Sequence, residues 1–269
     1  MQMITRMRPL LTLIFLVSAA PVLAQFTTKL EPHTIEEFNR YAQKVEQQLE
    51  PRWHGQQPFL TVDANASERE KVLRGDLFVR PGTPDNPVSI SNGLIHDWVG
   101  TVFIPNASIS KVLGILQDFD RHSTIYANII RSRLIRRDGN DVTGYWRLER
   151  KQGLLKVVLD VQEEAHYEEV GPGKWICKAY ANNIAEIENA GKPNEEKLPP
   201  DDGNGFLWRL YGYWSLEATH GGVLAECRTL SLSRDIPNAV AWIIKPFVQS
   251  LPRESLTSIL QQTRIAATK

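Results

Sequence analysis

The sequence predicts an α+β fold in which an antiparallel sheet wraps around a long C-terminal helix and carries a helical N-terminal extension. Successive stretches of alternating apolar and polar residues are separated by short turns, which is typical of an antiparallel meander. The last two stretches, 206–217 and 223–233, are joined through Gly221 and Gly222 as a hairpin. Apolar residues within 240–251 then keep helical spacing, so one wide apolar face closes the chain.

The N-terminal part, residues 25–89, is expected to be an extension that packs on the main domain. Apolar residues within 35–49 have the helical period, Thr34 is the expected N-cap, and Pro51 is expected to end the helix. The residues that follow are expected to form a short strand over 59–62, a polar turn over 65–70 and a strand over 71–79.

The main domain is expected to span residues 90–269. It should hold a strand over 90–104, a helix capped by Ser108, a helical turn at 120–126, and strands over 129–137, 142–152, 154–169 and 174–188. A polar loop over 189–204 leads to the closing hairpin, and Asn238 is available to cap the closing helix. Pro246 and Pro252 lie inside that helix and predict a kink or break at each position.

Residues 1–24 are expected to be a secretory signal peptide. Arg6 and Arg8 precede an apolar core, and small or branched residues lead to a cleavage expected between Ala24 and Gln25. A membrane anchor is the alternative, but the apolar run is shorter than the roughly 20 residues that a spanning helix needs. The mature protein is therefore expected to be soluble and periplasmic or secreted.

Composition and motifs exclude several classes of site. Lysine plus arginine and aspartate plus glutamate both number 31, so losing Arg6 and Arg8 leaves 29 against 31 and a net charge of −2. This balance gives no general footprint for nucleic acid. Six scattered histidines lack metal-ligand spacing, and no phosphate or nucleotide motif appears, so neither a metal nor a cofactor is expected. Cys177 and Cys227 fall in different predicted strands, where a disulfide and two buried thiols both stay open.

Three stretches resemble a known superfamily. Residues 103–120 combine a strand end, an Ile-Pro-Asn-Ala-Ser turn, a helix and an Asp-Phe-Asp corner, and 126–134 enter the next strand. Residues 214–237 form the last hairpin and its exit to the closing helix. These stretches resemble the START-like superfamily of helix-grip proteins, which includes coenzyme Q-binding, polyketide cyclase and Bet v 1-like families. The resemblance implies a curved antiparallel sheet that grips the C-terminal helix around an apolar cavity, in members that bind lipids, quinones or polyketides and in some that catalyse cyclisation.

Large apolar and aromatic side chains on the predicted strands and closing helix are the candidate ligand-binding residues. Tryptophan rings bury much area and need a hydrogen-bond partner for the indole N–H. Several of them on one face therefore favour a partly polar-lined apolar pocket rather than a solid core. The expected lining residues are Trp98, Tyr126, Trp146, Leu148, Trp208, Leu210, Trp214, Leu230, Ile244 and Phe247.

Two side chains are weak catalytic candidates. His96 shares a strand face with Trp98 and could act as a general base, although a satisfied core histidine is the favoured interpretation. Glu226 shares a face with Arg228, either as a buried polar anchor or, as favoured, on a solvated strand face. Arg147 and Glu149 are expected to be charges on the outer surface.

The sequence thus predicts an exported soluble protein that binds a hydrophobic small molecule, such as a lipid, a quinone or a polyketide-like compound, in an internal cavity. A cyclase- or hydrolase-like enzyme using His96 or Glu226 is one alternative, and a cell-envelope interaction protein is another. Arg131, Arg133, Arg136 and Arg137 form a basic strand that is either solvated or in transient contact with an anionic membrane surface. The oligomeric state is not predicted.

Overall fold

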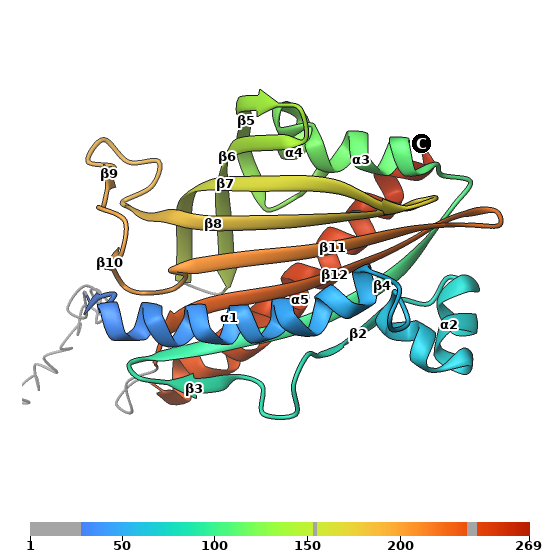
Figure 1. Cartoon of the computed structure of the whole chain (residues 1–269). Helices are drawn as coiled ribbons and strands as arrows, with labels where there is room; N and C mark the ends of the chain where they lie inside the picture. The colour runs from blue at the N-terminus through green and yellow to red at the C-terminus, as the bar shows by residue number, and fades with distance from the viewer. Residues whose placement is uncertain (1–27, 153–154, 236–240) are drawn as a thin grey trace, which may run out of the picture.

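The computed structural model describes residues 28–152, 155–235 and 241–269, without the side chains of 152, 155 and 241–249. Within this part, one ten-stranded antiparallel sheet carries helices on both faces (Figure 1), which confirms the predicted α+β class. Its strands are β2 (Phe78–Pro81), β3 (Val88–Ile90), β4 (Gly93–Pro105), β5 (Ile129–Asp138), β6 (Asp141–Gln152), β7 (Leu155–Gly171), β8 (Lys174–Glu188), β9 (Glu196–Lys197), β11 (Arg209–Thr219) and β12 (Gly222–Arg234).

Neighbouring strands follow the order β2-β4-β12-β11-β8-β7-β6-β5, with β3 beside β4 and β9 beside β8. The order confirms the predicted meander from β5 to β8 and the closing hairpin of β11 and β12. A separate pair joins β1 (Thr28–Lys29) to β10 (Asp202–Gly203) in the loop before β11. The helical segments are α1 (Pro32–Trp53), η2 (Thr61–Ala64), α2 (Ala66–Leu73), α3 (Ile109–Gln117), η3 (Phe119–Arg121), α4 (His122–Ile125) and α5 (Ala241–Thr268).

We call the face of the sheet toward α5 the inner face. Leu256 and Leu260 of α5 join buried residues of β4, β6, β7, β8, β11 and β12 in one hydrophobic cluster, which the apolar side of α3 completes. Removing this much apolar surface from water is the main force that holds α5 against the sheet. No helix in the described ranges is both long enough and apolar enough to cross a membrane.

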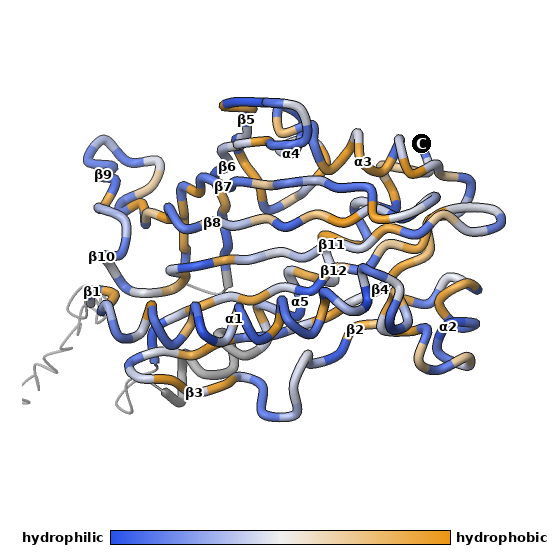
Figure 2. The backbone as a smooth tube through the Cα atoms, viewed as in Figure 1, coloured by the Kyte–Doolittle hydropathy of each residue, from blue (hydrophilic) through white to orange (hydrophobic). Residues whose placement is uncertain are grey.

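We call the opposite face of the sheet, toward α1, the outer face. A second hydrophobic cluster forms there, where Phe38, Val45 and Leu49 of α1 pack on buried residues of β4, β8, β11 and β12. Polar and apolar residues alternate along α1 (Figure 2), as expected for a helix with one buried face. The central strands are therefore covered on both faces, and their residues are buried whichever way they point.

The structure of the N-terminal extension differs from the prediction in three segments. Residues 59–62 and 71–79 were expected to be strands and 65–70 a polar turn, but 61–64 form a 3₁₀ turn and 66–73 form α2, with a strand only from Phe78. Asn65 caps α2 by accepting hydrogen bonds from the backbone N–H groups of Ser67 and Glu68. The cap and the good helix formers that follow it outweigh the weak apolar alternation.

The ends of α1 also differ from prediction. Pro32 starts the helix, and the Thr34 hydroxyl donates instead to the Ser91 carbonyl oxygen at 2.8 Å. Pro51 does not end α1, because the helix runs on to Trp53, whose buried indole N–H donates to Ser215 Oγ at 3.0 Å. Pro51 removes one backbone N–H donor from the last turn of the helix, and the packing of Trp53 stabilises that turn despite the missing hydrogen bond.

The closing helix α5 is continuous from Ala241 to Thr268, so Pro246 and Pro252 do not break it. Packing against the sheet holds the helix together across the lost hydrogen bonds. The predicted cap Asn238 lies outside the described residues. Cys177 and Cys227 are free thiols whose strands flank β11, each opposite Trp214. Two strand spacings separate their backbones by roughly 10 Å, which excludes a disulfide.

Candidate functional site

The inner face of β7 carries a row of apolar side chains with one carboxylate in it. Residues 157, 159, 161, 165 and 167 all belong to the inner cluster, so alternation places Glu163 on the same face. A bulge in the opposite strand leaves the row undisturbed, because the register shift between Gln162 and Glu164 adds its extra residue to β8. A charged group on this face is the strongest candidate for a functional residue.

Glu163 has no hydrogen bond or ion pair within the part of the chain that the structure describes. Burial raises the pKa of its carboxyl from 4.5 to about 7. The side chain nevertheless keeps some accessible surface. The residues around it therefore desolvate the carboxyl without enclosing it completely.

Aromatic and thiol groups surround Glu163. Its negative charge raises the pKa values of the Tyr126, Tyr167, Cys177 and Cys227 side chains, after the larger effect of burial. The Tyr126 hydroxyl, whose pKa rises to about 12, hydrogen-bonds Thr263 Oγ1 of α5 at 3.0 Å. Tyr167 donates to the Leu116 carbonyl oxygen of α3 at 3.2 Å. The surroundings are apolar, and the two tyrosine hydroxyl groups already form hydrogen bonds with other residues. Among the described residues, no cation lies within hydrogen-bond distance of the carboxylate.

A second charged group lies on the inner face, at Arg150 of β6. It is paired in register with Val157, which belongs to the inner cluster. Its Nη2 donates to Ser255 Oγ of α5 at 2.7 Å, while its buried Nε has no partner among the described residues. Burial lowers the pKa of this guanidinium. Because buried polar groups are nearly always paired, an unpaired Nε favours a ligand or water here.

Trp98 of β4 is a third incomplete group. Its buried indole N–H has no hydrogen-bond partner in the described ranges, and the Arg253 guanidinium lies 6.0 Å from the ring centroid. A pocket of about 550 Å³ lies where this tryptophan meets α5. The pocket is otherwise lined by Ser250, Arg253, Glu254, Thr257, Ser258 and Gln261.

The structure brings most of the predicted lining residues together. Trp98, Trp146, Leu148, Leu210 and Trp214 all belong to the inner cluster or pack against it. Tyr126 is buried and bonded to α5. The side chains of Ile244 and Phe247 lie outside the described residues. Contact of any of these residues with a ligand stays a prediction.

Two of the predicted lining residues were assigned to the wrong face. Trp208 and Leu230 pack in the outer cluster beneath α1. β11 begins only at Arg209, so the alternation that orients Trp214 does not extend back to Trp208. Leu230 shares the outer face with Glu226, and both faces of β12 are buried, which leaves no polar row to mark the outside.

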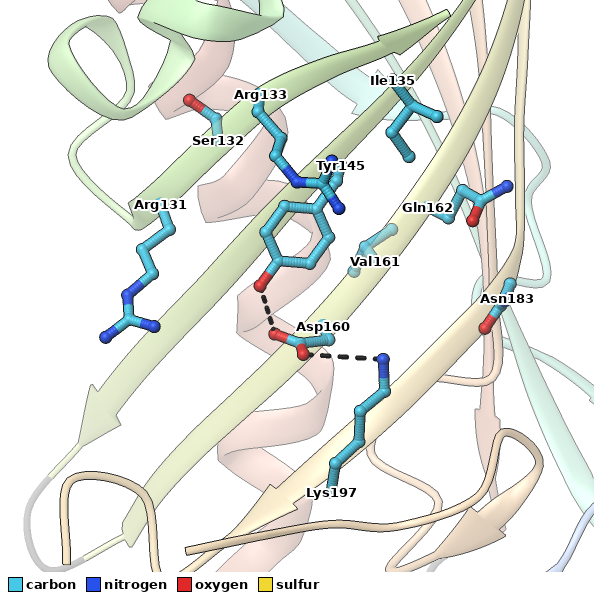
Figure 3. A pocket seen from close by; sticks show the side chains of 10 residues that line it. All are labelled: Arg131, Ser132, Arg133, Ile135, Tyr145, Asp160, Val161, Gln162, Asn183 and Lys197. Carbon is cyan, nitrogen blue, oxygen red and sulfur yellow. Dashed lines mark hydrogen bonds and ion pairs between the residues drawn. The ribbon is translucent and has the colours of Figure 1, made fainter.

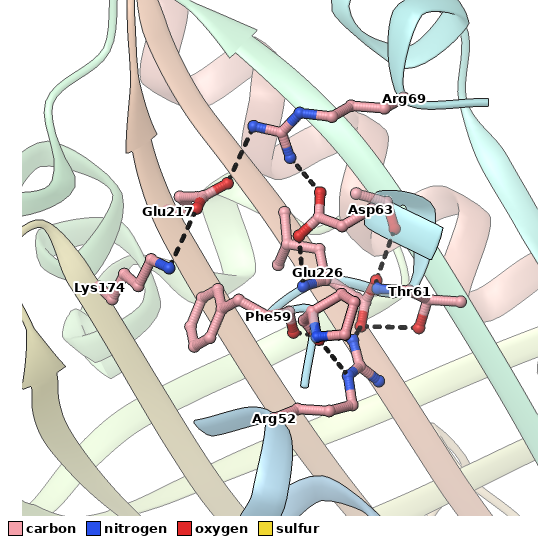
Figure 4. Close-up of polar contacts among 11 residues, drawn as sticks. Arg52, Phe59, Thr61, Asp63, Arg69, Lys174, Glu217 and Glu226 are labelled. Atoms are coloured by element: carbon pink, nitrogen blue, oxygen red, sulfur yellow. Dashed lines mark hydrogen bonds and ion pairs between the residues drawn. The ribbon is translucent and has the colours of Figure 1, made fainter. Parts of the chain in front are cut away.

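Glu226 is a structural anchor rather than a solvated or catalytic group. Its buried carboxylate accepts hydrogen bonds from Arg52 Nη2 at 2.8 Å, from Thr61 N and Oγ1 at 2.6 and 3.0 Å, and from Thr101 Oγ1 at 2.9 Å (Figure 4). Both oxygens are fully used, and they tie α1 and η2 to the sheet. The favoured expectation of a solvated strand face is therefore wrong, and the buried-anchor alternative is correct.

Buried ion pairs also replace two expected surface charges. Arg228 is paired with Asp97, whose carboxylate also accepts a hydrogen bond from Tyr41 of α1 at 2.8 Å. Arg147 was expected on the surface but is buried, with Nε 2.6 Å and Nη2 3.1 Å from the Asp160 carboxylate oxygens. A bidentate pair of this kind stays charged inside a protein because each partner satisfies the other.

His96 lies on the buried strand β4 and is 2% exposed. Its Nε2 is 3.3 Å from Ser233 Oγ, and burial lowers its pKa from 6.5 to about 4. The ring is therefore neutral near pH 7, and no carboxylate orients it among the described residues. No group of three or more metal-ligating side chains gathers in the described part of the chain either.

No protein-family profile and no curated protein matches this sequence. Among solved structures, a STAR-related lipid transfer protein from Xanthomonas axonopodis is 15% identical, with a TM-score of 0.46 over 72% of this chain and 99% of that one. Human STARD10 is 11% identical, with a TM-score of 0.42 over 92% and 84% of the two chains. The Zhui aromatase/cyclase from Streptomyces is 10% identical, with a TM-score of 0.36 over 65% and 89%. Each of these structures is similar to this chain at low identity and with a TM-score below 0.5.

Proposed function

We propose that this helix-grip protein binds a hydrophobic small molecule between the inner face of its sheet and α5, with Glu163 as the polar recognition group. The observation that carries the proposal is the unpartnered carboxyl of Glu163 in the otherwise apolar row of β7 on the inner face of the described sheet. An empty apolar site would leave this group uncompensated, at a cost of roughly 1–3 kcal/mol for an unmet hydrogen bond. A ligand that carries its own hydrogen-bonding group removes that cost.

The charge on Glu163 restricts the ligand. With a pKa of about 7, the carboxyl is protonated in about half of the molecules at neutral pH and then donates a hydrogen bond. A neutral acceptor such as a quinone or ketone carbonyl therefore fits, while a carboxylate at the same point would be repelled. The ligand class that follows is an apolar body with a neutral oxygen acceptor, such as a quinone or a polyketide-like ketone.

Titration with a fluorescent ubiquinone analogue tests the proposal. Wild type should bind about fivefold more tightly at pH 6 than at pH 8.5, because the donor proton is lost and one hydrogen bond is worth about 1 kcal/mol. Glu163→Gln should bind with no pH dependence, since the amide keeps a donor. Glu164→Gln, at the exposed neighbouring position, is the matched control and should behave like wild type. Absence of probe binding by all three proteins at both pH values would rule out the pocket.

A second candidate function rests on the same carboxyl. A side chain whose pKa lies near the working pH is suited to general acid–base catalysis, so a cyclase- or hydrolase-like reaction is the alternative. A carrier returns its ligand unchanged, whereas an enzyme changes the mass or connectivity of the bound molecule. Chromatography and mass spectrometry of a polyketide-like ketone before and after incubation separate the two, with Glu163→Gln abolishing any turnover.

We also propose that the chain is exported, with cleavage between Ala24 and Gln25. Support comes from the basic, apolar and small-residue segments at the N-terminus. An exported carrier would move an apolar compound through the aqueous compartment outside the inner membrane.

A further inference from the structure

The edge strand β5 exposes an unusual pair of side chains. β5 lies at one end of the sheet order, and its pairing with β6 has two register shifts, one between Ile129 and Arg131 and one between Leu134 and Arg136. The extra residue of each bulge is an isoleucine, Ile130 and Ile135, and these are 45% and 43% exposed. Bulges on an edge strand hinder pairing with another sheet and can redirect side chains. Here both bulges turn a large apolar side chain toward solvent.

Two arginines, Arg131 and Arg133, lie between these isoleucines in the sequence. Arg131 and Arg133 are exposed on the outer face, where they are paired in register with Arg147 and Tyr145 of β6. The Arg133 guanidinium lies 5.4 Å from the centre of the Tyr145 ring. The helix α1 covers β4, β12, β11 and β8 but contributes no buried contact with β5 or β6 in the described ranges. This corner of the outer face is therefore open.

A polar pocket of about 610 Å³ occupies the open corner (Figure 3). Arg131, Arg133 and Lys197 line it together with Ile135 and Tyr145. Ser132, Gln162 and Asn183 supply further hydrogen-bonding groups, and Asp160 and Val161 form the remainder of the lining.

The charge of this corner is positive. Asp160 is already held by Arg147, by the Tyr145 hydroxyl at 2.8 Å and by Lys197 at 3.6 Å. Glu195 accepts hydrogen bonds from the backbone N–H of Gly191 and from Arg147, and these, followed by the charge of Arg131, lower the pKa of its carboxyl. Four cations, at 131, 133, 147 and 197, thus face two carboxylates, at 160 and 195, for a local charge of +2. Arg136 is excluded from the sum because Asp138 pairs with it at 3.7 Å.

We propose that this corner, defined by Ile130, Arg131, Arg133, Ile135 and Lys197, docks the protein on an anionic lipid bilayer. The two exposed isoleucines enter the headgroup boundary, and the pocket receives the phosphate of an anionic phospholipid between the arginines and Lys197. Apolar side chains flanked by basic ones fit such a surface, where apolar burial and attraction to the negative leaflet add together. A neutral bilayer offers no negative charge for the arginines and Lys197, and free phosphate offers no apolar layer for the isoleucines.

Co-sedimentation with phosphatidylcholine vesicles, with and without phosphatidylglycerol, tests the proposal on the mature chain. Wild type should bind the phosphatidylglycerol vesicles more strongly, and added salt should weaken that binding. The double variant Arg133→Gln/Ile135→Ser should bind them at least tenfold more weakly, since one basic residue near such a surface contributes about fivefold and apolar burial contributes further. Arg74→Gln/Ile265→Ser removes an exposed arginine and an exposed isoleucine elsewhere and should bind like wild type.

Several outcomes would overturn the proposal. Equal loss in both double variants would mean that the corner is not special, and equal binding to neutral vesicles would remove the role of the arginines. If wild type ignores vesicles but forms a dimer that Arg133→Gln/Ile135→Ser abolishes, the corner is an interface between two β5 edges. Circular dichroism and ubiquinone-probe titration of each variant serve as independent readouts. Retained probe binding with lost vesicle binding separates docking from the interior site.

Discussion

Replacing Glu163 by glutamine should stabilise the protein in a way that depends on pH. Folding raises the pKa of this carboxyl from 4.5 to about 7, so the folded state holds the proton more tightly than the unfolded state. The stability that this group contributes is fully present below pH 4.5 and is lost as pH rises through 7. A tenfold difference in proton affinity between the two states is worth about 1.4 kcal/mol, so wild type loses about 3 kcal/mol between pH 4 and pH 8.5. Glutamine keeps the shape of the side chain and a hydrogen-bond donor, and it does not ionise. The stability of Glu163→Gln should therefore not fall as the pH rises.

Urea unfolding of ligand-free wild type, Glu163→Gln and Glu164→Gln at pH 5 and pH 8.5 measures the effect. Glu163→Gln should exceed wild type by about 1 kcal/mol or less at pH 5 and by about 3 kcal/mol at pH 8.5. In a domain of this size that gain corresponds to a rise of about 6–12 °C in melting temperature at pH 8.5. The exposed Glu164 should show neither effect. A difference that is the same at both pH values, or that Glu164→Gln shares, would refute the interior placement of Glu163.

The remaining predictions concern both faces of the sheet and the N-terminus. Trp214→Ala on the inner face should clearly weaken probe binding and lower the free energy of unfolding by less than the usual 3–5 kcal/mol. Trp208→Ala beneath α1 should lower the free energy of unfolding by that full amount and leave probe binding unchanged. Denaturant unfolding and probe titration of both variants decide this. Glu226→Ala should destabilise by about 3–5 kcal/mol in urea because it takes a buried carboxylate away from Arg52, Thr61 and Thr101, and an effect below 1 kcal/mol would contradict the anchor role. His96→Gln should leave the fold and probe affinity largely intact, while a fall of about 100-fold or more in any discovered kcat would favour the enzyme. N-terminal sequencing of native material should begin at Gln25, and recovery of Met1 would disprove processing.

The sequence predicted the main domain well because its signals are local. The strands from 129 to 188 are separated by turns that contain glycine, and the observed bounds of β8 match the predicted range of 174–188. The N-cap at Ser108 is also observed, with its hydroxyl oxygen accepting from the Lys111 N–H at 3.2 Å. Each of these features depends on residues within a few positions of one another.

Face assignments depend on tertiary packing and were less predictable. The same alternation in β12 puts Leu230 on one face and Cys227 on the other, and nothing local says which face α1 covers. Glu226 illustrates the consequence: a charged residue on a strand suggests solvent, but Arg52, distant in sequence, reaches it at 2.8 Å. Only knowledge that α1 lies over the outer face resolves such cases.

Glu163 was missed for a different reason, although a signal was present. Val157, Leu159, Val161 and Ala165 have the same parity as Glu163, so the alternation itself contains one acidic residue in an apolar row. The surrounding polar run from Gln162 to Glu164 hides it, because three consecutive polar residues resemble a solvated segment. Searching each strand face separately for a lone charged residue would have found both this carboxyl and Arg150.

Native mass spectrometry of the protein purified without detergent from its own host tests most directly whether the interior holds a ligand. The binding account predicts a species heavier than the bare mature chain, whose extra mass organic solvent extracts as an apolar compound with a neutral oxygen acceptor. Glu163→Gln prepared in the same way should retain that compound at pH 8.5 better than wild type does, since wild type then places a negative charge beside it. A spectrum of the bare chain alone, together with no binding of the ubiquinone probe at pH 6, would contradict the account.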